Sequence, residues 1–163
     1  MKVIYLVRHA KSSWKDHRLT DFNRPLNKRG KKDAPLMGEK LKEKHIKPDS
    51  ILSSPANRAK KTALAIAEKI FYPTQKIVFK EDLYEASEIT ILNHIKKLDE
   101  KLDSIMVFAH NPGLTQLNNL ISVNYIDNIP TCGIVALECD KKWIEVSKNS
   151  CRLLFFEYPK KYR

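Results

Sequence analysis

Hydrophobic residues along this chain fall into short continuous runs separated by longer polar or amphipathic segments. The first run, residues 3–7, is apolar without alternation, which is typical of a strand buried on both faces of a parallel sheet. Comparable runs predict further strands at 50–53, 76–84 and 104–109. Each of these runs leads into a segment with a different, helical periodicity.

The segments between the runs carry apolar residues at helical spacing. Asn27 is predicted as the N-cap of a first helix that extends to the break at Pro48. Ser54, which a proline follows, and Ser87 are predicted N-caps of the next two helices, and Pro112 begins a fourth. The inward faces of the four helices are Ala34, Met37, Leu41 and His45; Ala59, Ala63, Ile66, Ala67 and Ile70; Ile91, Leu92, Ile95 and Leu98; and Leu114, Leu117, Leu120 and Ile121.

The predicted strands and helices alternate until the end of the chain, where two strands come in succession. These last runs, 133–139 and 152–158, are separated by a polar turn region and predict an antiparallel pair. The order of elements argues for an α/β fold, a three-layer α/β/α domain with a mostly parallel sheet and an antiparallel edge. A length of 163 residues fits a single domain, 1–163, that can bury a substantial core.

The charge balance favours anionic ligands, since 30 Lys and Arg against 19 Asp and Glu give a formal net charge of +11. No RNA-recognition motif or zinc-finger spacing accompanies the basic residues, which are spread along the chain. We therefore do not expect nucleic acid to be the main partner. The lysines that show this spread are Lys40, Lys42, Lys44, Lys69, Lys96, Lys97, Lys101, Lys141 and Lys160.

The cysteines and the hydropathy indicate a cytoplasmic protein. Cys132, Cys139 and Cys151 are odd in number and lack CxxC spacing, so neither a disulfide framework nor a zinc site is indicated and reduced thiols are expected. The apolar run 3–7 is too short for a signal peptide, and no later segment is apolar enough to span a bilayer. We expect no membrane association.

Four cationic or imidazole side chains lie at the ends of predicted strands. Arg8 and His9 follow the first strand, Arg58 lies in the first turn after the second, and His110 follows 104–109. Because the carboxyl ends of parallel strands share one edge of a sheet, these side chains should converge there. Two guanidiniums and two imidazoles would form a pocket for a tetrahedral dianion such as a phosphoryl group or sulfate.

The residue types in this pocket suggest a reaction. A backbone carbonyl would hold one ring nitrogen of His9, and the other would attack phosphorus in line. Arg8, Arg58 and a protonated His110 would stabilise charge on the equatorial oxygens. Water would then hydrolyse the phosphohistidine intermediate, and arginines would supply the positive charge without a metal or cofactor. The remaining histidines have no metal-ligand spacing: His17, His45 and His94.

At these positions the sequence resembles the histidine phosphatase superfamily, also called the phosphoglycerate mutase-like fold. Residues 6–10 resemble the signature whose histidine is phosphorylated, with Ala10 where glycine is common. Residues 23–30 resemble the substrate-side loop, 53–59 the segment with the second phosphate-binding arginine, and His110-Asn111 the second histidine. The resemblance covers nearly the whole chain and implies a phosphatase.

Within the superfamily, residues 8–12 and 129–132 look most like the SixA branch, the phosphohistidine phosphatases. The resemblance implies a partner that carries phosphohistidine, such as a histidine phosphotransfer domain, and a pocket without the large insertions that enclose small substrates. Glu85 stands where phosphoester-cleaving members keep an acidic proton donor. The candidate catalytic residues are thus His9, Arg8, Arg58, His110 and Glu85, and the candidate substrate-binding residues are Arg8, Arg58, His110, Asn111, Ser12 and Arg24.

Three other interpretations stay open at this point. The protein could be a phosphomonoesterase for a small phosphorylated metabolite, a phosphate- or phosphohistidine-binding module without turnover, or a nucleic-acid binder that uses its positive charge. Hydrolysis of a generic aryl phosphate separates the two enzymes from the two binders.

Overall fold

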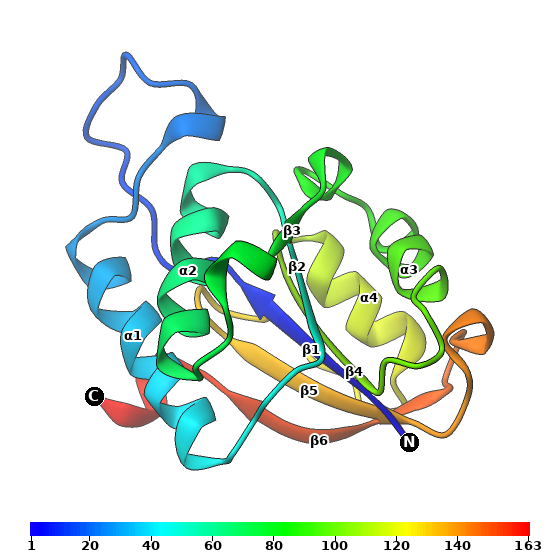
Figure 1. The fold of residues 1–163 in the computed structure, drawn as a ribbon. Helices are drawn as coiled ribbons and strands as arrows, with labels where there is room; N and C mark the ends of the chain where they lie inside the picture. Colours follow the sequence, from blue (N-terminus) through cyan, green and yellow to red (C-terminus); the bar gives the residue numbers. More distant parts are fainter.

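A six-stranded sheet in the order β3-β2-β4-β1-β5-β6 forms the centre of the computed structural model, which describes residues 1–163 (Figure 1). The first four strands of that order are parallel, and β5 and β6 pair antiparallel at one edge. This arrangement confirms the predicted three-layer α/β fold of the phosphoglycerate mutase type. The strands are β1 (Lys2–Arg8), β2 (Ser50–Ser53), β3 (Val78–Phe79), β4 (Ser104–Ala109), β5 (Ile134–Cys139) and β6 (Cys151–Glu157).

Two pairs of helices cover the two faces of the sheet (Figure 1). The helices are α1 (Lys28–Glu43) and α2 (Asn57–Lys69) on one face, and α3 (Glu88–Lys96) and α4 (Gly113–Ile121) on the other. None of them is both long and apolar enough to cross a lipid bilayer.

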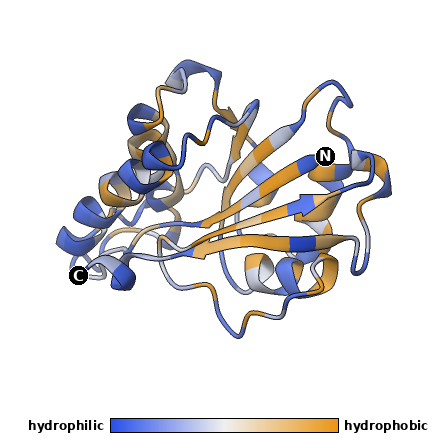
Figure 2. Ribbon diagram, turned by 90° about the horizontal axis from the view of Figure 1, so that it is seen from below, coloured by the Kyte–Doolittle hydropathy of each residue, from blue (hydrophilic) through white to orange (hydrophobic).

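The central strand β1 divides the hydrophobic core because its side chains alternate between the two faces. Ile4 and Leu6 pack in the cluster with α3 and α4, whereas Tyr5 and Val7 pack in the cluster with α1 and α2. Figure 2 shows the result, with mainly hydrophobic strands between helices whose outer faces are hydrophilic. Burial on both faces explains why the sequence of β1 does not alternate.

Two predicted elements are shorter in the structure. The first helix ends at Glu43, because His45 adopts a left-handed conformation with φ 58° and leaves the helix before Pro48. The strand predicted at 76–84 is reduced to Val78–Phe79, an exposed edge strand. The charged residues that follow it form a 3₁₀ turn, Glu81–Leu83, instead of continuing the pairing.

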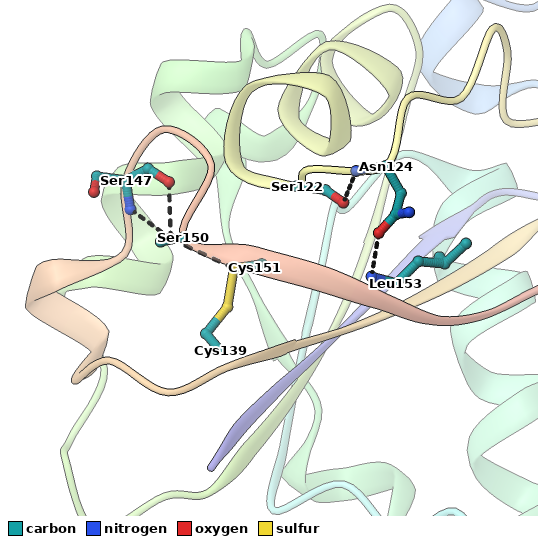
Figure 3. The surroundings of a disulfide bond; sticks show 7 residues. All are labelled: Ser122, Asn124, Cys139, Ser147, Ser150, Cys151 and Leu153. Carbon is teal, nitrogen blue, oxygen red and sulfur yellow. Dashed lines mark hydrogen bonds between the residues drawn. A yellow bond between two sulfur atoms is a disulfide. The ribbon is translucent and has the colours of Figure 1, made fainter.

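A disulfide joins Cys139 to Cys151, so the expectation of three reduced thiols was wrong (Figure 3). The two cysteines are directly opposite one another in the antiparallel pairing of β5 with β6, and their Cα atoms lie 4.5 Å apart. The spacing of the cysteines in the sequence could not predict this bond, because the pairing register of β5 with β6 places the two residues opposite one another. Cys132 remains a free, buried thiol.

Two glycines allow the close backbone contacts that fix loops beside the sheet. A Cβ at Gly30, in the first turn of α1, would lie 2.2 Å from the carbonyl oxygen of Lys11. A Cβ at Gly113, the first residue of α4, would lie 2.1 Å from the carbonyl oxygen of Ala86. Both contacts are with backbone atoms, so any side chain at either position would displace a loop.

Candidate active site

His9 lies immediately after β1, buried beneath the carboxyl edge of the parallel strands. Its Nδ1 is 2.8 Å from the carbonyl oxygen of Ala10, a contact that keeps the proton on Nδ1 and leaves Nε2 as the free nitrogen. The backbone N–H of Ala10 donates to Thr62 Oγ1 at 2.9 Å, and that hydroxyl donates to the carbonyl of Arg58 at 2.7 Å. Helix α2 therefore fixes the turn that carries His9.

His110 follows β4, the neighbour of β1, and its ring lies beside that of His9 with 5.2 Å between centroids. Its Nε2 is 2.8 Å from Ser54 Oγ, and that oxygen also accepts the N–H of Ala56 at 3.2 Å. The predicted N-cap role of Ser54 was wrong, because α2 begins at Asn57 with Ala56 as N-cap. Ser54 instead orients the second histidine.

Arg58, in the first turn of α2, contacts Asp21 from the long loop after β1. Its Nη1 donates to the backbone carbonyl of Asp21 at 2.7 Å and its Nη2 to Oδ2 at 3.0 Å. The hydroxyl of Tyr84 donates to the same Oδ2 at 2.5 Å, and the Tyr84 ring stands edge-on to His110 at 5.6 Å. These contacts link the loop, α2 and the end of β4.

Arg24 and Ser12 meet on the other side of Asp21. Arg24 Nη2 donates to Ser12 Oγ, and Nε lies 3.6 Å from Asp21 Oδ1. The guanidinium carbon of Arg24 is 3.3 Å from the centre of the Trp14 ring, which is itself exposed. The stacked and buried guanidinium is thus held in one orientation at the rim of the site.

Several buried N–H donors in this region have no hydrogen-bond partner in the protein. They are Nε of Arg8, Nε and Nη1 of Arg24, Nε of Arg58 and, in the tautomer whose Nε2 accepts from Ser54, Nδ1 of His110. Buried polar groups in folded proteins are nearly always paired, and each unpaired donor costs roughly 1–3 kcal/mol. Donors of four neighbouring side chains left unpaired together are suited to an anion that accepts several hydrogen bonds.

The charges of these groups act on one another. Burial lowers the pKa of His9 to about 3, although the Ala10 carbonyl opposes that shift, and His110, Arg58 and Arg8 lower it further. Burial and then Arg58 lower the pKa of His110 to about 4. Burial and the Arg58 charge also lower the pKa values of Arg8 and Arg24. Positive charge is therefore concentrated around Arg58.

Both histidines are consequently neutral at neutral pH in the free protein. For His9 this leaves the Nε2 lone pair available. For His110 the neutral form is favoured in the free protein because burial beside Arg58 disfavours a further positive charge, whereas the protonated ring expected from the sequence belongs to the state with a bound phosphoryl group. A bound dianion would offset the repulsion and raise the pKa of His110.

Asp21 and Tyr84 have shifted pKa values of opposite sign. The Tyr84 hydroxyl and, after it, Arg58 lower the pKa of Asp21, while burial opposes the shift. The hydrogen bond to Asp21 raises the pKa of Tyr84 to about 12. Asp21 is thus a carboxylate at neutral pH, and the neutral Tyr84 hydroxyl donates a hydrogen bond to it.

The structure brings the predicted site residues to one region of the molecule, but the side chains of Asn111 and Glu85 differ from the others in their contacts and exposure. Arg8, His9, Arg58 and His110 lie at one edge of the sheet, with Ser12 and Arg24 beside them. Asn111 is not free to bind substrate, because its amide nitrogen donates to Ile129 O at 2.9 Å and its oxygen accepts from Thr115. Glu85 is exposed, has φ 56°, and makes neither a hydrogen bond nor an ion pair.

Four residues at the site were not predicted to act there. Asp21 lies in the polar loop 11–26, and only the unusual length of that loop pointed to a function. Tyr84 lies at the end of the predicted strand 76–84 and carries no motif of its own. Ser54 and Thr62 are helix-associated hydroxyls that become positioning groups only through the packing of α2 against β1 and β4.

The arrangement can hold a tetrahedral anion beside a neutral imidazole nitrogen. The unpaired donors come from three guanidiniums and one imidazole, and the free Nε2 of His9 is the candidate nucleophile. No group of three or more histidine, cysteine, aspartate or glutamate side chains is placed to hold a metal ion.

Comparison with known proteins connects this site with a family. Residues 4–88, which include His9 and Arg58, match the model of the histidine phosphatase superfamily (branch 1). An uncharacterized protein of Mycobacterium tuberculosis is 27% identical over 164 residues, an alignment that covers 94% of this chain and all of the relative.

Solved structures of similar fold span nearly the full chain. A protein of Agrobacterium tumefaciens that carries the assignment phosphohistidine phosphatase SixA is 29% identical, with a TM-score of 0.81 over 97% of this chain and 98% of the other. The protein histidine phosphatase SixA complexed with tungstate is 20% identical, with a TM-score of 0.85 over 99% of both chains. At that lower identity the second likeness is one of fold.

Proposed function

Because this chain belongs to the histidine phosphatase superfamily and is a phosphatase, we propose that its substrate is phosphohistidine carried by a protein. The observation that carries the proposal is the set of buried, unpaired donors of Arg8, Arg24, Arg58 and His110 next to the free Nε2 of His9. Three phosphoryl oxygens can accept these hydrogen bonds while the phosphorus faces the imidazole.

The first step is attack of His9 Nε2 on phosphorus. The N–P bond to His9 forms as the bond from phosphorus to the leaving nitrogen or oxygen breaks, and the guanidiniums hold the charge on the equatorial oxygens. The Nδ1–H···O contact with Ala10 stabilises the positive charge that His9 gains. In the second step water attacks phosphorus, which releases orthophosphate and returns His9 to its neutral form.

His110 acts as a hydrogen-bond donor to the phosphoryl group. Ser54 Oγ accepts the N–H of Ala56, and we assign the hydroxyl proton of Ser54 to its hydrogen bond with His110 Nε2. The proton of the neutral ring then sits on Nδ1, the atom that lacks a protein partner. Dianion binding raises the pKa of His110, so the ring can also gain a proton as the transition state forms.

The choice of phosphohistidine over a phosphoester rests on the leaving group. An alkoxide needs a proton in the transition state, but the exposed Glu85 has no contact that would hold it over the pocket. Imidazole has a reference pKa of about 6.5, so phosphohistidine can be protonated on its other ring nitrogen and leave neutral. The likeness to the assigned SixA of Agrobacterium tumefaciens along nearly the full length of both chains supports the same choice.

A direct comparison of substrates tests the proposal. We would measure kcat/KM for a phosphohistidine peptide, for phosphoserine and for a generic aryl phosphate with one preparation of the protein. The proposal expects the phosphohistidine peptide to exceed phosphoserine by about 10² or more, the contribution of a positioned general acid. A preference for phosphoserine or another small phosphoester would instead identify a metabolite phosphomonoesterase, and binding without turnover would identify a non-catalytic module.

The proposal requires no metal ion or cofactor, since the arginines supply the positive charge. Activity should therefore be unchanged by a chelator, and restoration by magnesium of activity lost to the chelator would contradict this part. We also infer a phosphohistidine-bearing protein, such as a histidine phosphotransfer domain, as partner and the cytoplasm as location.

A further inference from the structure

A broad groove of about 1080 Å³ runs between the first half of α1 and the 3₁₀ turn Pro159–Tyr162 near the end of the chain. Figure 1 shows this red C-terminal segment beside α1. Six basic residues and one acidic residue line the groove, a net charge of +5. The basic residues are Lys15, Lys28, Arg29, Lys32, Lys160 and Arg163.

The single carboxylate in the groove is already neutralised. Asp33 is buried, and both of its oxygens accept from Arg163 Nη1 at 3.1 Å, while Arg29 Nε lies 3.6 Å away. The four lysines are exposed and form no ion pair with any residue of the chain. Their ammonium groups are therefore free for an external anion.

The groove begins next to the active-site residues. A ribbon of paired backbone connects the two, with Ser12 bridged to Leu26 and the N–H of Ser13 donating to Pro25 O at 2.8 Å. Lys15 is three residues beyond Ser12, a distance of at most about 10 Å along the chain. A second hollow of about 400 Å³ lies along this ribbon and shares three residues with the groove: Lys15, Asn27 and Lys28.

The lining is unsuited to single-stranded nucleic acid, which binds through bases stacked on exposed aromatic rings. Tyr162 is the one aromatic residue in the groove. Lys40 lies 4.4 Å from the centre of its ring, and its hydroxyl bonds to Glu157. A flexible acidic polypeptide needs no stacking surface and matches the charge of the lysines.

We propose that this basic groove docks an acidic segment of the protein whose phosphohistidine enters the active site. The inference rests on the proposed function. It adds a second surface, which recognises a part of the substrate protein outside its phosphohistidine. Attraction between the lysines and carboxylates raises the rate of encounter, and salt weakens it because exposed charges are screened over about 8–10 Å.

Two phosphohistidine peptides that differ only in a flanking run of glutamates or of glutamines test the inference. At low salt, kcat/KM for the acidic peptide should exceed that for the neutral one by about tenfold, and the ratio should fall toward one at high salt. In the double variant Lys28→Glu/Lys32→Glu the ratio should fall to about one. Both positions lie in the first turns of α1, where glutamate is compatible with the helix dipole.

The matched control is Lys101→Glu/Lys148→Glu, which changes the net charge equally in exposed turns outside the groove. The control should keep the preference for the acidic peptide. Equal loss in both double variants would mean that bulk charge is responsible, and equal kcat/KM for the two peptides in wild type would likewise overturn the docking role.

Binding of the unphosphorylated acidic peptide, followed by fluorescence anisotropy, separates this inference from the proposed function. Binding that Lys28→Glu/Lys32→Glu abolishes supports the groove even where phosphohistidine is not hydrolysed. If a single-stranded oligonucleotide of equal charge bound more tightly than the acidic peptide, and Lys28→Glu/Lys32→Glu weakened that binding, the ligand of the groove would be nucleic acid. That result would overturn the proposed docking of an acidic protein segment.

Discussion

The guanidinium of Arg58 donates two hydrogen bonds to Asp21, one to the backbone carbonyl oxygen at 2.7 Å and one to the side-chain Oδ2 at 3.0 Å. This is the paired geometry in which a guanidinium binds two phosphoryl oxygens. The Asp21 carboxylate therefore competes with a substrate dianion for the hydrogen bonds of Arg58. Its negative charge also repels the dianion and weakens its binding.

Asp21→Asn is expected to strengthen inhibition by orthophosphate. Loss of the ion pair frees Arg58 and removes a like charge, an effect of about twofold to fivefold in the inhibition constant for a partly exposed pair. Asp16→Asn is the control, because Asp16 lies in the same loop but pairs with Arg18. Weaker inhibition in Asp21→Asn would show that Asp21 holds Arg58 in place for the anion.

Arg58→Ala is expected to reduce kcat/KM by about 10²–10³, in the range seen when a donor to transition-state charge is removed. Arg58→Lys should recover only part of this loss, since an ammonium cannot make the paired contact of a guanidinium. Lys61→Ala, an exposed position on the same helix, controls for effects on α2. Full activity in Arg58→Lys would contradict the paired geometry.

Stability should fall as the pH falls below about 6.5, because His9 and His110 have pKa values of about 3 and about 4 in the folded protein. Between about pH 6.5 and pH 4 the unfolded chain, whose histidines titrate near 6.5, binds protons that the folded protein does not. Each histidine should lower the free energy of unfolding by about 2 kcal/mol between pH 7 and pH 5.

Urea denaturation at the two pH values measures this loss, and His110→Gln isolates one contribution. The decrease in the free energy of unfolding between pH 7 and pH 5 should be smaller in His110→Gln than in wild type. The difference should equal the contribution of one histidine, about 2 kcal/mol. An identical drop in both proteins would show that His110 is not held neutral by the fold.

Glu85→Gln is expected to distinguish the two classes of substrate. Because no contact holds Glu85 over the pocket, Glu85→Gln should leave phosphohistidine hydrolysis nearly unchanged, and a loss of about 10² or more confined to alkyl phosphoesters would identify Glu85 as their proton donor. Glu81→Gln, in the same exposed segment, is the control. Equal large losses on both substrates would assign Glu85 a structural or binding role, and no loss on either would remove it from the site.

The pattern of the sequence was sufficient for the sheet and for the residues at its carboxyl edge. Arg8, His9 and His110 follow continuous apolar strands, and the ends of parallel strands must meet, so their convergence is a consequence of topology. Arg58 follows for the same reason, because α2 starts close to the end of β2.

The contacts that complete the site depend on register and on loop conformation, which leave no periodic signal. Asp21 and Tyr84 are 63 residues apart and meet only because the loop after β1 folds against the first turn of α2 and the segment that follows β3. The Cys139–Cys151 disulfide likewise follows from the pairing register of β5 and β6. The sequence also did not predict that the side-chain amide of Asn111 bonds to Ile129 and Thr115, because a motif does not show which hydrogen bonds its residues make within the protein.

The central claim is that Nε2 of His9 carries the phosphoryl group during turnover. Rapid quench with a ³²P-labelled phosphohistidine peptide, followed by mass spectrometry of the digested protein, measures this directly. The account predicts acid-labile label on His9 within the first turnover, and neither label nor activity in His9→Ala. Turnover without label in wild type, together with an unchanged rate in His9→Ala, would contradict it.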